Sequence, residues 1–282
     1  LHLSIRRQRQ MCIRDSAYVG VKGGMVIVSA DDPGPISSQT EQDTRRFADF
    51  CRIPVFDPSS PEEAYKMIGD AFEYSEKYNT PVLFRPTTRV CHAYASINNC
   101  DSPSPKKYEG FVKDSKKWVI FPRLSFANHI MIEKRNVEIG KDFSTYSANK
   151  AEGGNSAKAV VTSGISYAYT KECLKNYPDV KLIKIATAYP FPEDFVLSSL
   201  EGAKEVLCIE ELSPFIEEQI LKLAGKHGLQ LKVSGKLDGK VQAGGENSTD
   251  KIAAILGEFL GKDFTAEGYD PVSYTHLTLP TN

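Results

Sequence analysis

Short apolar runs alternate with amphipathic stretches over residues 17–97. The runs at 24–30, 53–56 and 81–85 are rich in β-branched and aromatic side chains, which is typical of buried parallel strands. Helical spacing at 41–51 places Phe47, Phe50 and Cys51 on one side. A second helix begins at Ser60, with a cap, a first-turn proline and early acids. The alternation predicts the later part of a doubly wound parallel domain.

The same alternation returns over residues 157–262. Strands are expected at 159–162, 180–185, 205–209 and 229–233, with helices between them and a last helix at 249–260. This order predicts a second, mainly parallel sheet.

Residues 98–156 differ from both of these regions, because they contain stretches rich in Pro, Ser and Lys or in Gly and Asn. We interpret them as a connector with one helix at 124–137, whose apolar side carries Phe126, Ile130 and Val137.

Composition narrows the class of protein. The chain has 282 residues, a net charge of -1 and six cysteines. No apolar run is long enough for a membrane span, and the balanced charge argues against nucleic-acid binding. The cysteines never reach CxxC spacing, and neither a GxGxxG motif nor a P-loop occurs. We therefore expect a cytoplasmic protein with reduced thiols, with no metal site and no partnership with nucleic acid or membrane.

The two ends of the chain are related to each other at the level of DNA. Residues 5–15 (IRRQRQMCIRD) and 272–282 (VSYTHLTLPTN) can be read as opposite strands of one sequence, for example Met11 as ATG against His276 as CAT. The implied DNA resembles a transposon-end sequencing adaptor. We expect residues 1–16 and 272–282 to be adaptor-derived, rather than a basic arm that binds nucleic acid. Without them the charge is -4, because four Arg and one Asp are removed.

The densest group of polar side chains follows the first predicted strand. Residues 37–46 read SSQTEQDTRR, and ligands of open α/β sheets lie beyond the carboxyl ends of strands. Ser and Gln can orient a substrate, Glu41 or Asp43 can accept a proton, and Arg45 or Arg46 can bind a carboxylate. The alternative is a capped helix start with a solvated charged face.

Two further groups also follow predicted strands. The first could bind an anion or a partner, although an ordinary loop is the favoured interpretation; it comprises Arg85, Thr87, Thr88, Arg89 and His92. The second is the pair Glu210 and Glu211. Adjacent side chains of an extended chain point in opposite directions, so this pair is poorly suited to acid–base catalysis. We expect one of the two to contact another domain.

Several motifs carry a resemblance to a known family. In the first region they are ADDP at 30–33, SSQTEQD at 37–43, TPVLFR at 80–85 and TTR at 87–89. In the second they are VTSGISYAY at 161–169, AYPFPED at 188–194 and EELSPFIEEQI at 210–220. Together they resemble the alpha subunit of the indolepyruvate ferredoxin oxidoreductases, which depend on thiamine diphosphate.

The resemblance implies a fold and a set of domain boundaries. Residues 17–97 would be the end of the pyrimidine-binding domain, 98–156 the connector, and 157–262 an α/β domain like the C-terminal domain of transketolases. Residues 263–271 would begin a linker to a further domain.

The resemblance also implies a function. The family oxidatively decarboxylates indolepyruvate and other aryl pyruvates to aryl-acetyl-CoA and reduces ferredoxin. It uses thiamine diphosphate, Mg²⁺ and 4Fe-4S clusters, and it works with a beta subunit in a hetero-oligomer. The ligands for metal and clusters would lie outside this chain, which we therefore expect to be inactive alone.

Within the chain, the resemblance favours a loop beside the substrate pocket formed by Ser37, Ser38, Gln39, Glu41 and Arg46. Ile36 stands where many relatives would have His, which bears on substrate preference. Two alternatives stay open. One is a sibling enzyme acting on pyruvate, 2-oxoglutarate or a branched-chain 2-oxo acid. The other is a noncatalytic assembly subunit.

Overall fold

The first sheet is small and entirely parallel. In the computed structural model, which describes residues 2–34, 39–98, 110, 112–154, 156–262 and 264, it consists of β1 (Val26–Val28), β2 (Val55–Phe56) and β3 (Val82–Phe84). The order is β1-β3-β2, so the last strand in sequence lies in the centre, where Leu83 pairs with both Ile27 and Val55. The three predicted strands and their parallel arrangement are confirmed.

Four helices surround this sheet. They are α1 (His2–Val19), α2 (Thr44–Cys51), α3 (Pro61–Tyr78) and α4 (Thr88–His92). Helix α3 begins as predicted, because the Ser60 side chain accepts a hydrogen bond from the Glu63 N–H. Helix α2 buries Ala48 and Cys51, but Phe50 is 63% exposed and lies under the Arg14 guanidinium. Of the three side chains predicted to lie on one side of this helix, Cys51 is thus buried, Phe47 is partly buried and Phe50 is exposed.

The second sheet has five strands in the order β4-β6-β5-β7-β8. They are β4 (Lys150–Glu152), β5 (Lys158–Ser163), β6 (Lys181–Ile185), β7 (Glu205–Ile209) and β8 (Lys232–Ser234). All pairs are parallel except β4 with β6. The mainly parallel sheet was predicted; β4 was not, and it falls inside the stretch expected to be connector.

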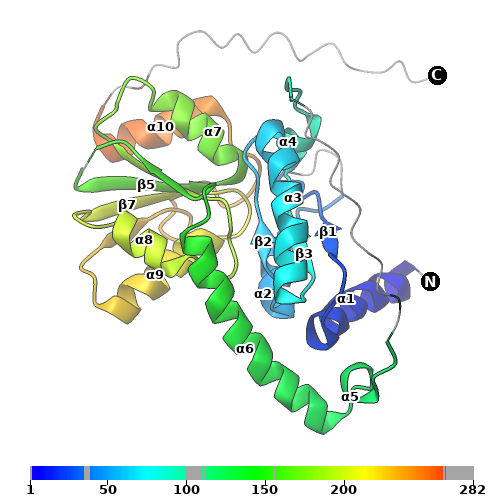
Figure 1. The fold of residues 1–282 in the computed structure, drawn as a ribbon. Helices are drawn as coiled ribbons and strands as arrows, with labels where there is room; N and C mark the ends of the chain where they lie inside the picture. The colour runs from blue at the N-terminus through cyan, green and yellow to red at the C-terminus, as the bar shows by residue number, and fades with distance from the viewer. Residues whose placement is uncertain are drawn as a thin grey trace, which may run out of the picture.

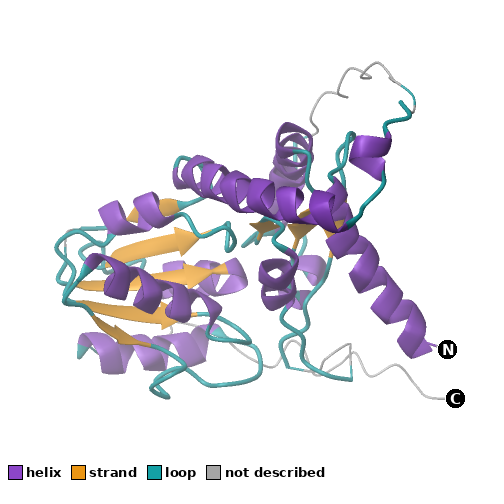
Figure 2. Cartoon of the chain, turned by 90° about the horizontal axis from the view of Figure 1, so that it is seen from below, coloured by secondary structure: helices purple, strands orange, loops and turns teal. Residues whose placement is uncertain are grey.

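Helices cover both faces of the second sheet (Figures 1 and 2). Helices α7 (Gly164–Cys173) and α10 (Thr249–Leu260) share one apolar cluster, which includes Tyr167 and Ile252. Helices α8 (Glu193–Ser199) and α9 (Phe215–His227) contribute Val196 and Ile216 to the cluster on the other face. This layered arrangement confirms the predicted α/β class. None of the helices in the described ranges has the length and apolar character of a membrane-spanning segment.

The two sheets share one apolar core. A single cluster of buried side chains contains Ile53 and Val55 from the first region and Ile183 and Ile185 from the second. The backbone also joins them, because the Val55 N–H donates to the Tyr189 carbonyl over 2.7 Å and the Asp57 N–H donates to the Ala186 carbonyl over 2.8 Å. The sheets therefore pack directly on each other.

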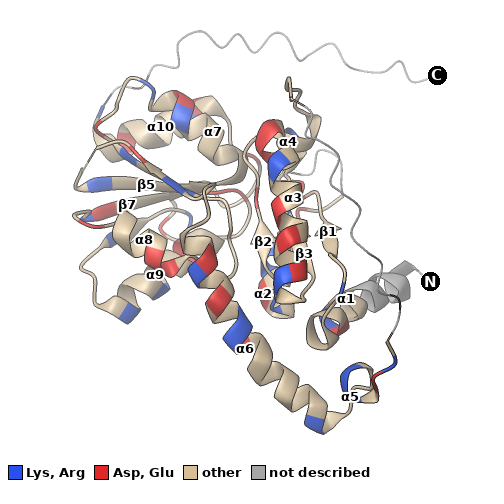
Figure 3. Ribbon diagram, in the orientation of Figure 1, with Lys and Arg blue, Asp and Glu red and all other residues tan. Residues whose placement is uncertain are grey.

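The connector contains a short helix α5 (Ser115–Trp118) and the long helix α6 (Pro122–Ser144). The C-terminal part of α6 packs into the aromatic cluster around Phe56 through Phe143, with ring centroids 5.3 Å apart. Its N-terminal part extends away from the sheets toward α5 and carries few charges (Figures 1 and 3). Phe126, Ile130 and Val137 are 70%, 43% and 61% exposed, so the predicted apolar side was wrong. The packed face instead carries Ile132, Ile139 and Phe143, because α6 packs against α1, α8 and the aromatic cluster of the first region.

Candidate functional site

Charged side chains converge where the carboxyl ends of the first sheet's strands meet the second sheet. Asp31 follows β1, Asp57 follows β2 and Arg85 follows β3. Arg85 joins the two acids, because its Nε lies 2.5 Å from Asp31 Oδ2 and its Nη1 lies 3.1 Å from Asp57 Oδ2. All three side chains are at most 2% exposed. Parallel strands bring their carboxyl ends to one edge, so residues far apart in sequence become neighbours here.

Arg45 extends this cluster into the second sheet. Its guanidinium binds both carboxylate oxygens of Asp43, and its Nη1 lies 2.6 Å from Glu210 Oε2. Its Nη2 also donates to the carbonyls of Glu211 and Ser213. Burial lowers the pKa of Arg45, but the charges of Asp43 and Glu210 outweigh burial and leave the pKa raised. The guanidinium is therefore a fully buried, fixed cation that links the two sheets.

The two glutamates after β7 have separate roles. Glu210 accepts hydrogen bonds from the N–H groups of Ile216 and Glu217 at the start of α9, in addition to the bond from Arg45. Glu211 accepts a hydrogen bond from the Asn247 N–H over 2.9 Å. The expectation that they point to different partners, one of them in another region, is confirmed.

The pKa values of the carboxyl groups in the cluster are shifted in different directions. Burial raises the pKa of Glu211 to about 7, although the Asn247 N–H and the charge of Arg85 oppose it. Burial likewise raises the pKa of Asp57 above its ordinary value, against the opposing charge of Arg85. Burial by itself would also raise the pKa of Asp43, but the charge of Arg45 and its hydrogen bond outweigh burial. They hold the pKa of Asp43 well below its usual range. Glu211 is thus the carboxyl of this cluster that can exchange a proton near neutral pH.

Some polar atoms of the cluster have no hydrogen-bond partner. Within the described part of the chain these include Asp57 Oδ1, Arg85 Nη2 and Thr87 Oγ1, all of them buried. Gly164 comes close to them at the start of α7: it has φ +54°, and a Cβ there would lie 3.0 Å from Asp57 Oδ1. The cluster therefore offers one acceptor and two donor groups beyond its internal ion pairs.

The predicted substrate-pocket loop lies partly outside the described residues, because Ser37, Ser38 and Ile36 are not among them. Gln39 is exposed. Glu41 accepts hydrogen bonds from the Gly34 N–H over 2.7 Å and from the Gly245 N–H over 2.6 Å, so it ties its loop to the second region.

Arg46 binds Glu218 on α9 through two hydrogen bonds of 2.5 and 2.7 Å, and both side chains are 40% exposed. The structure therefore does not bring Glu41 and Arg46 together on one group. Their role at a substrate pocket stays a prediction.

The predicted group of residues after β3 is also divided between the buried cluster and the surface. Arg85 belongs to the buried cluster, Thr88 donates to Asp32 over 2.7 Å, and Arg89 binds Glu246 on the surface. His92 is exposed. The sequence reasoning did not select Asp31 and Asp57 as site residues. The signal that could have found them is an acid directly after each predicted strand.

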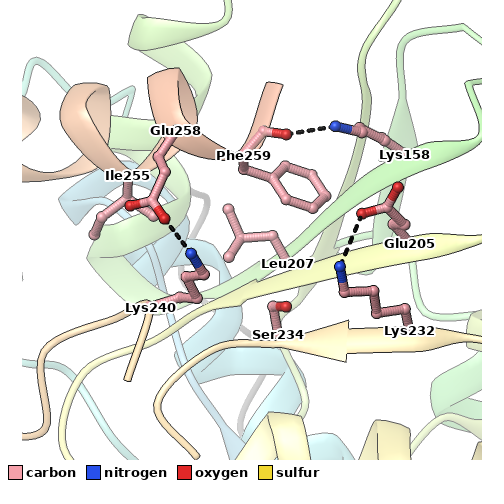
Figure 4. A pocket seen from close by; sticks show the side chains of 9 residues that line it. All are labelled: Lys158, Glu205, Leu207, Lys232, Ser234, Lys240, Ile255, Glu258 and Phe259. Carbon is pink, nitrogen blue, oxygen red and sulfur yellow. Dashed lines mark hydrogen bonds and ion pairs between the residues drawn. The ribbon is translucent and has the colours of Figure 1, made fainter. Parts of the chain in front are cut away.

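A cavity of about 210 Å³ lies at the other end of the second sheet (Figure 4). It is lined by residues that begin strands, including Lys158, Glu205 and Lys232. The Lys158 ammonium donates to the Phe259 carbonyl over 2.6 Å, Lys232 lies 3.9 Å from Glu205, and Lys240 pairs with Glu258. Each charged side chain of the lining already has a polar partner, and the cavity lies far from the carboxyl ends, so we do not assign it as the site.

The described residues contain no group of three His, Cys, Asp or Glu side chains that could hold a metal ion. The cysteines in these ranges are all free thiols; Cys12 and Cys91 are exposed, whereas Cys51 and Cys208 are buried. Burial raises the pKa of Cys51 to about 11 and that of Cys208 well above its ordinary value. This part of the chain thus provides no set of ligands for a metal ion or an iron–sulfur cluster.

A solved structure shares this architecture. A 2-oxoglutarate:ferredoxin oxidoreductase from Magnetococcus marinus, whose structure has 2-oxoglutarate, coenzyme A and succinyl-CoA bound, superimposes with a TM-score of 0.57. The match covers 88% of this chain and 55% of that one, at 14% sequence identity. The two-sheet arrangement is therefore also found in the fold of that enzyme.

Sequence comparison is more specific. Indolepyruvate oxidoreductase subunit IorA of Thermococcus kodakarensis is 37% identical over 255 residues, and that of Pyrococcus horikoshii is 35% identical over 254. Each match covers 87% of this chain but 39% of the relative. No protein-family model matches the chain. Over most of its length the chain is similar to the IorA subunits, and it spans about two fifths of the length of these relatives.

Proposed function

We propose that this chain is part of the alpha subunit of an enzyme that oxidatively decarboxylates indolepyruvate and other aryl pyruvates to aryl-acetyl-CoA and reduces ferredoxin. The observation that carries the proposal is the 37% identity to an indolepyruvate oxidoreductase subunit over 255 residues. A match of that length must include most of both sheets and the chain segments that join them. The proposal also includes a beta subunit as partner in a hetero-oligomer, because the relatives are named as subunits.

The described residues do not fit the metal or the clusters of such an enzyme, since they form no ligand group. We therefore assign the ligands of Mg²⁺ and of the 4Fe-4S clusters to the parts of the relatives that lie outside the matched 39%. When bound, thiamine diphosphate supplies the electron sink for decarboxylation. What this chain contributes is a rigid junction of two sheets, with a polar loop at the carboxyl ends of the strands.

The proposal keeps the loop with Ser37, Ser38, Gln39, Glu41 and Arg46 beside the substrate. Two observations support it. Glu41 and Arg46 both link the first region to the second, through Gly245 and Glu218. The buried cluster holds α2 in place through Arg45. Side chains fixed on such a base, as Glu41 and Arg46 are, can position a substrate, since sites need a supporting shell that does not move.

A chimaera tests the proposed substrate. Residues 17–271 would replace the matching segment of the Thermococcus kodakarensis subunit, which is then produced with its partner subunit. We expect CoA-dependent ferredoxin reduction with indolepyruvate at a higher kcat/KM than with pyruvate, 2-oxoglutarate or a branched-chain 2-oxo acid. The unmodified relative is the control. An assembled chimaera that prefers one of the other acids would indicate a sibling enzyme, and one with bound cofactors but no turnover would indicate a noncatalytic subunit.

The chain alone is expected to be inactive. Purified residues 17–271 should show neither 2-oxo acid turnover nor tight binding of thiamine diphosphate in calorimetry. Either result would contradict the assignment of the cofactor ligands to other parts of the subunit.

A further inference from the structure

The segment 235–247, which we call the strap, joins β8 to α10 and begins at the carboxyl end of β8. Acids of the second region hold both of its ends through backbone hydrogen bonds. Glu217 on α9 accepts from the Lys236 N–H over 2.7 Å, and Glu211 accepts from the Asn247 N–H over 2.9 Å. Both carboxylates are buried, so the ends of the strap are fixed to the second region.

Glu41 binds the strap from the first region. Its Oε1 atom accepts one hydrogen bond from the Gly34 N–H over 2.7 Å and another from the Gly245 N–H over 2.6 Å. One carboxylate oxygen can accept both bonds because it has two acceptor positions. Glu41 is exposed, so water competes for both bonds, and the connection can open without unfolding either sheet. A single side chain thus joins the loop between β1 and α2 to the strap.

Glycines allow the two segments to approach each other closely. Gly34 has φ +68° and Gly245 has φ +80°, in the left-handed region that favours glycine. A Cβ on Gly34 would lie 3.3 Å from the Cα of Gly245, and a Cβ on Gly244 would lie 3.1 Å from Glu41 Oε2. Both distances are shorter than an ordinary van der Waals contact. A side chain at Gly34 or Gly244 would therefore push the loop and the strap apart.

Two further contacts keep the strap next to the first sheet. Arg89, which follows β3, donates from Nε to Glu246 Oε2 over 2.7 Å. The buried Asn247 side chain donates from Nδ2 to Ser166 Oγ on α7 over 2.9 Å. The strap is thus bound to the segments that follow β1 and β3, while its own ends stay on the second region.

We propose that Glu41 is a positioning residue, through which the strap fixes the loop between β1 and α2. This inference rests on the proposed function, because that loop is proposed to lie beside the substrate. It replaces the interpretation of Glu41 as a proton acceptor, which the sequence alone left open. Glu41 Oε1 is already bound to two N–H groups, so its contribution is to hold the backbone of the loop against the second region.

Two variants in the assembled chimaera distinguish positioning from proton transfer. Glu41→Gln keeps a carbonyl oxygen that can accept both hydrogen bonds, but its amide cannot take up a proton from substrate. Glu41→Ala loses the acceptor altogether. We expect Glu41→Gln to retain at least about three times the kcat/KM of Glu41→Ala with indolepyruvate, as the loss of two hydrogen bonds implies. Equal values in the two variants, whether high or low, would overturn the proposal.

Hydrogen–deuterium exchange of the full chain, followed by NMR, tests the connection without any turnover. Glu41→Ala should speed exchange of the Gly245 amide about tenfold, and Glu41→Gln should speed it less than about threefold. Gly34→Ala should act like Glu41→Ala, because it separates the loop from the strap. Gly239→Ala is the matched control: Gly239 also lies in the strap at φ +78°, but a Cβ there would meet nothing within 4 Å.

The two experiments fail in different ways. A chimaera that shows no turnover before Glu41 is changed would contradict the proposed function, and exchange in the full chain would still report on Glu41. Exchange at Gly245 that is the same in Glu41→Ala as in the natural sequence would overturn the positioning role, whatever reaction the enzyme catalyses. Faster exchange in Gly239→Ala equal to that in Gly34→Ala would also overturn it, because backbone strain alone would then explain the effect.

Discussion

Buried arginines occur in two regions of this molecule, and they meet opposite surroundings. At the junction of the sheets, Arg45 and Arg85 are 0% and 2% exposed, and both bind carboxylates. On α6, Arg135 is 7% exposed and has no acid partner among the described residues. The pKa of Arg45 is raised because its acids outweigh burial, whereas burial lowers the pKa of Arg135 to about 10.

The difference shows that burial alone does not define what a charged side chain does. At the junction the charges are compensated internally, so they fix geometry and hold two sheets together. On α6 the charge is uncompensated, so burial of the same kind of side chain costs stability. The following predictions test this contrast, from the largest expected effect to the smallest.

Arg45→Met should destabilise the chain by about 4 kcal/mol, because it leaves Glu210 and Asp43 buried without their cation. Urea unfolding followed by circular dichroism measures the change. Glu210→Gln in the same background should recover part of the loss. A loss below about 1 kcal/mol would mean that Arg45 does not compensate buried acids.

Glu211 should make stability depend on pH. Its pKa is about 7 in the folded chain, above its ordinary value of 4.5, so the folded state binds the proton more strongly. Stability should therefore fall as pH rises from about 4.5 to 7, by about 3 kcal/mol in total. The comparison is with Glu211→Gln, whose advantage over the natural sequence should grow over the same pH range in urea titrations. A constant difference would contradict the shifted pKa.

Arg135→Met should act in the opposite direction to Arg45→Met. It removes an uncompensated buried charge, so we expect a gain of about 1 kcal/mol in the free energy of unfolding. The two variants are measured side by side by urea unfolding. A loss similar to that of Arg45→Met would show that the two regions do not differ in the way described above.

Arg46→Met should have the smallest effect. Arg46 also binds a carboxylate, but both partners are 40% exposed, and solvent screens their attraction. We expect a loss of about 0.5 kcal/mol in urea unfolding, decreasing further at high salt. A loss as large as that of Arg45→Met would show that exposure does not distinguish the two neighbouring arginines.

The sequence predicted most of the fold, because strand and helix signals are local. The strands at 53–56, 81–85 and 205–209 and the start of α3 at Ser60 are visible as apolar runs and caps. The packed face of α6 could not be predicted in the same way. Phe126, Ile130 and Val137 have the spacing of an ordinary amphipathic helix, yet they are exposed. Ile139 and Phe143 are buried instead because of tertiary contacts, which the local pattern does not show.

The candidate site was predicted less completely. Their positions after predicted strands identified Glu210, Glu211 and Arg85 as candidates. The sequence did not show with which residues they would form ion pairs or hydrogen bonds. Arg45 and Glu210 lie 165 residues apart, and no local pattern connects them. Arg45 and Arg46 are adjacent and chemically identical, so the sequence could not show that Arg45 is buried while Arg46 reaches solvent.

The bond between Arg45 and Glu210 also limits how this protein can be rearranged. Each half of the ion pair is encoded far from the other, so exchanging only one sheet for a foreign counterpart would leave an unmatched charge inside the junction. The two sheets are therefore expected to be inherited and recombined together. If the gene is divided at a point between the two sheets, we expect the Arg45–Glu210 ion pair to be retained as a contact between the two resulting chains.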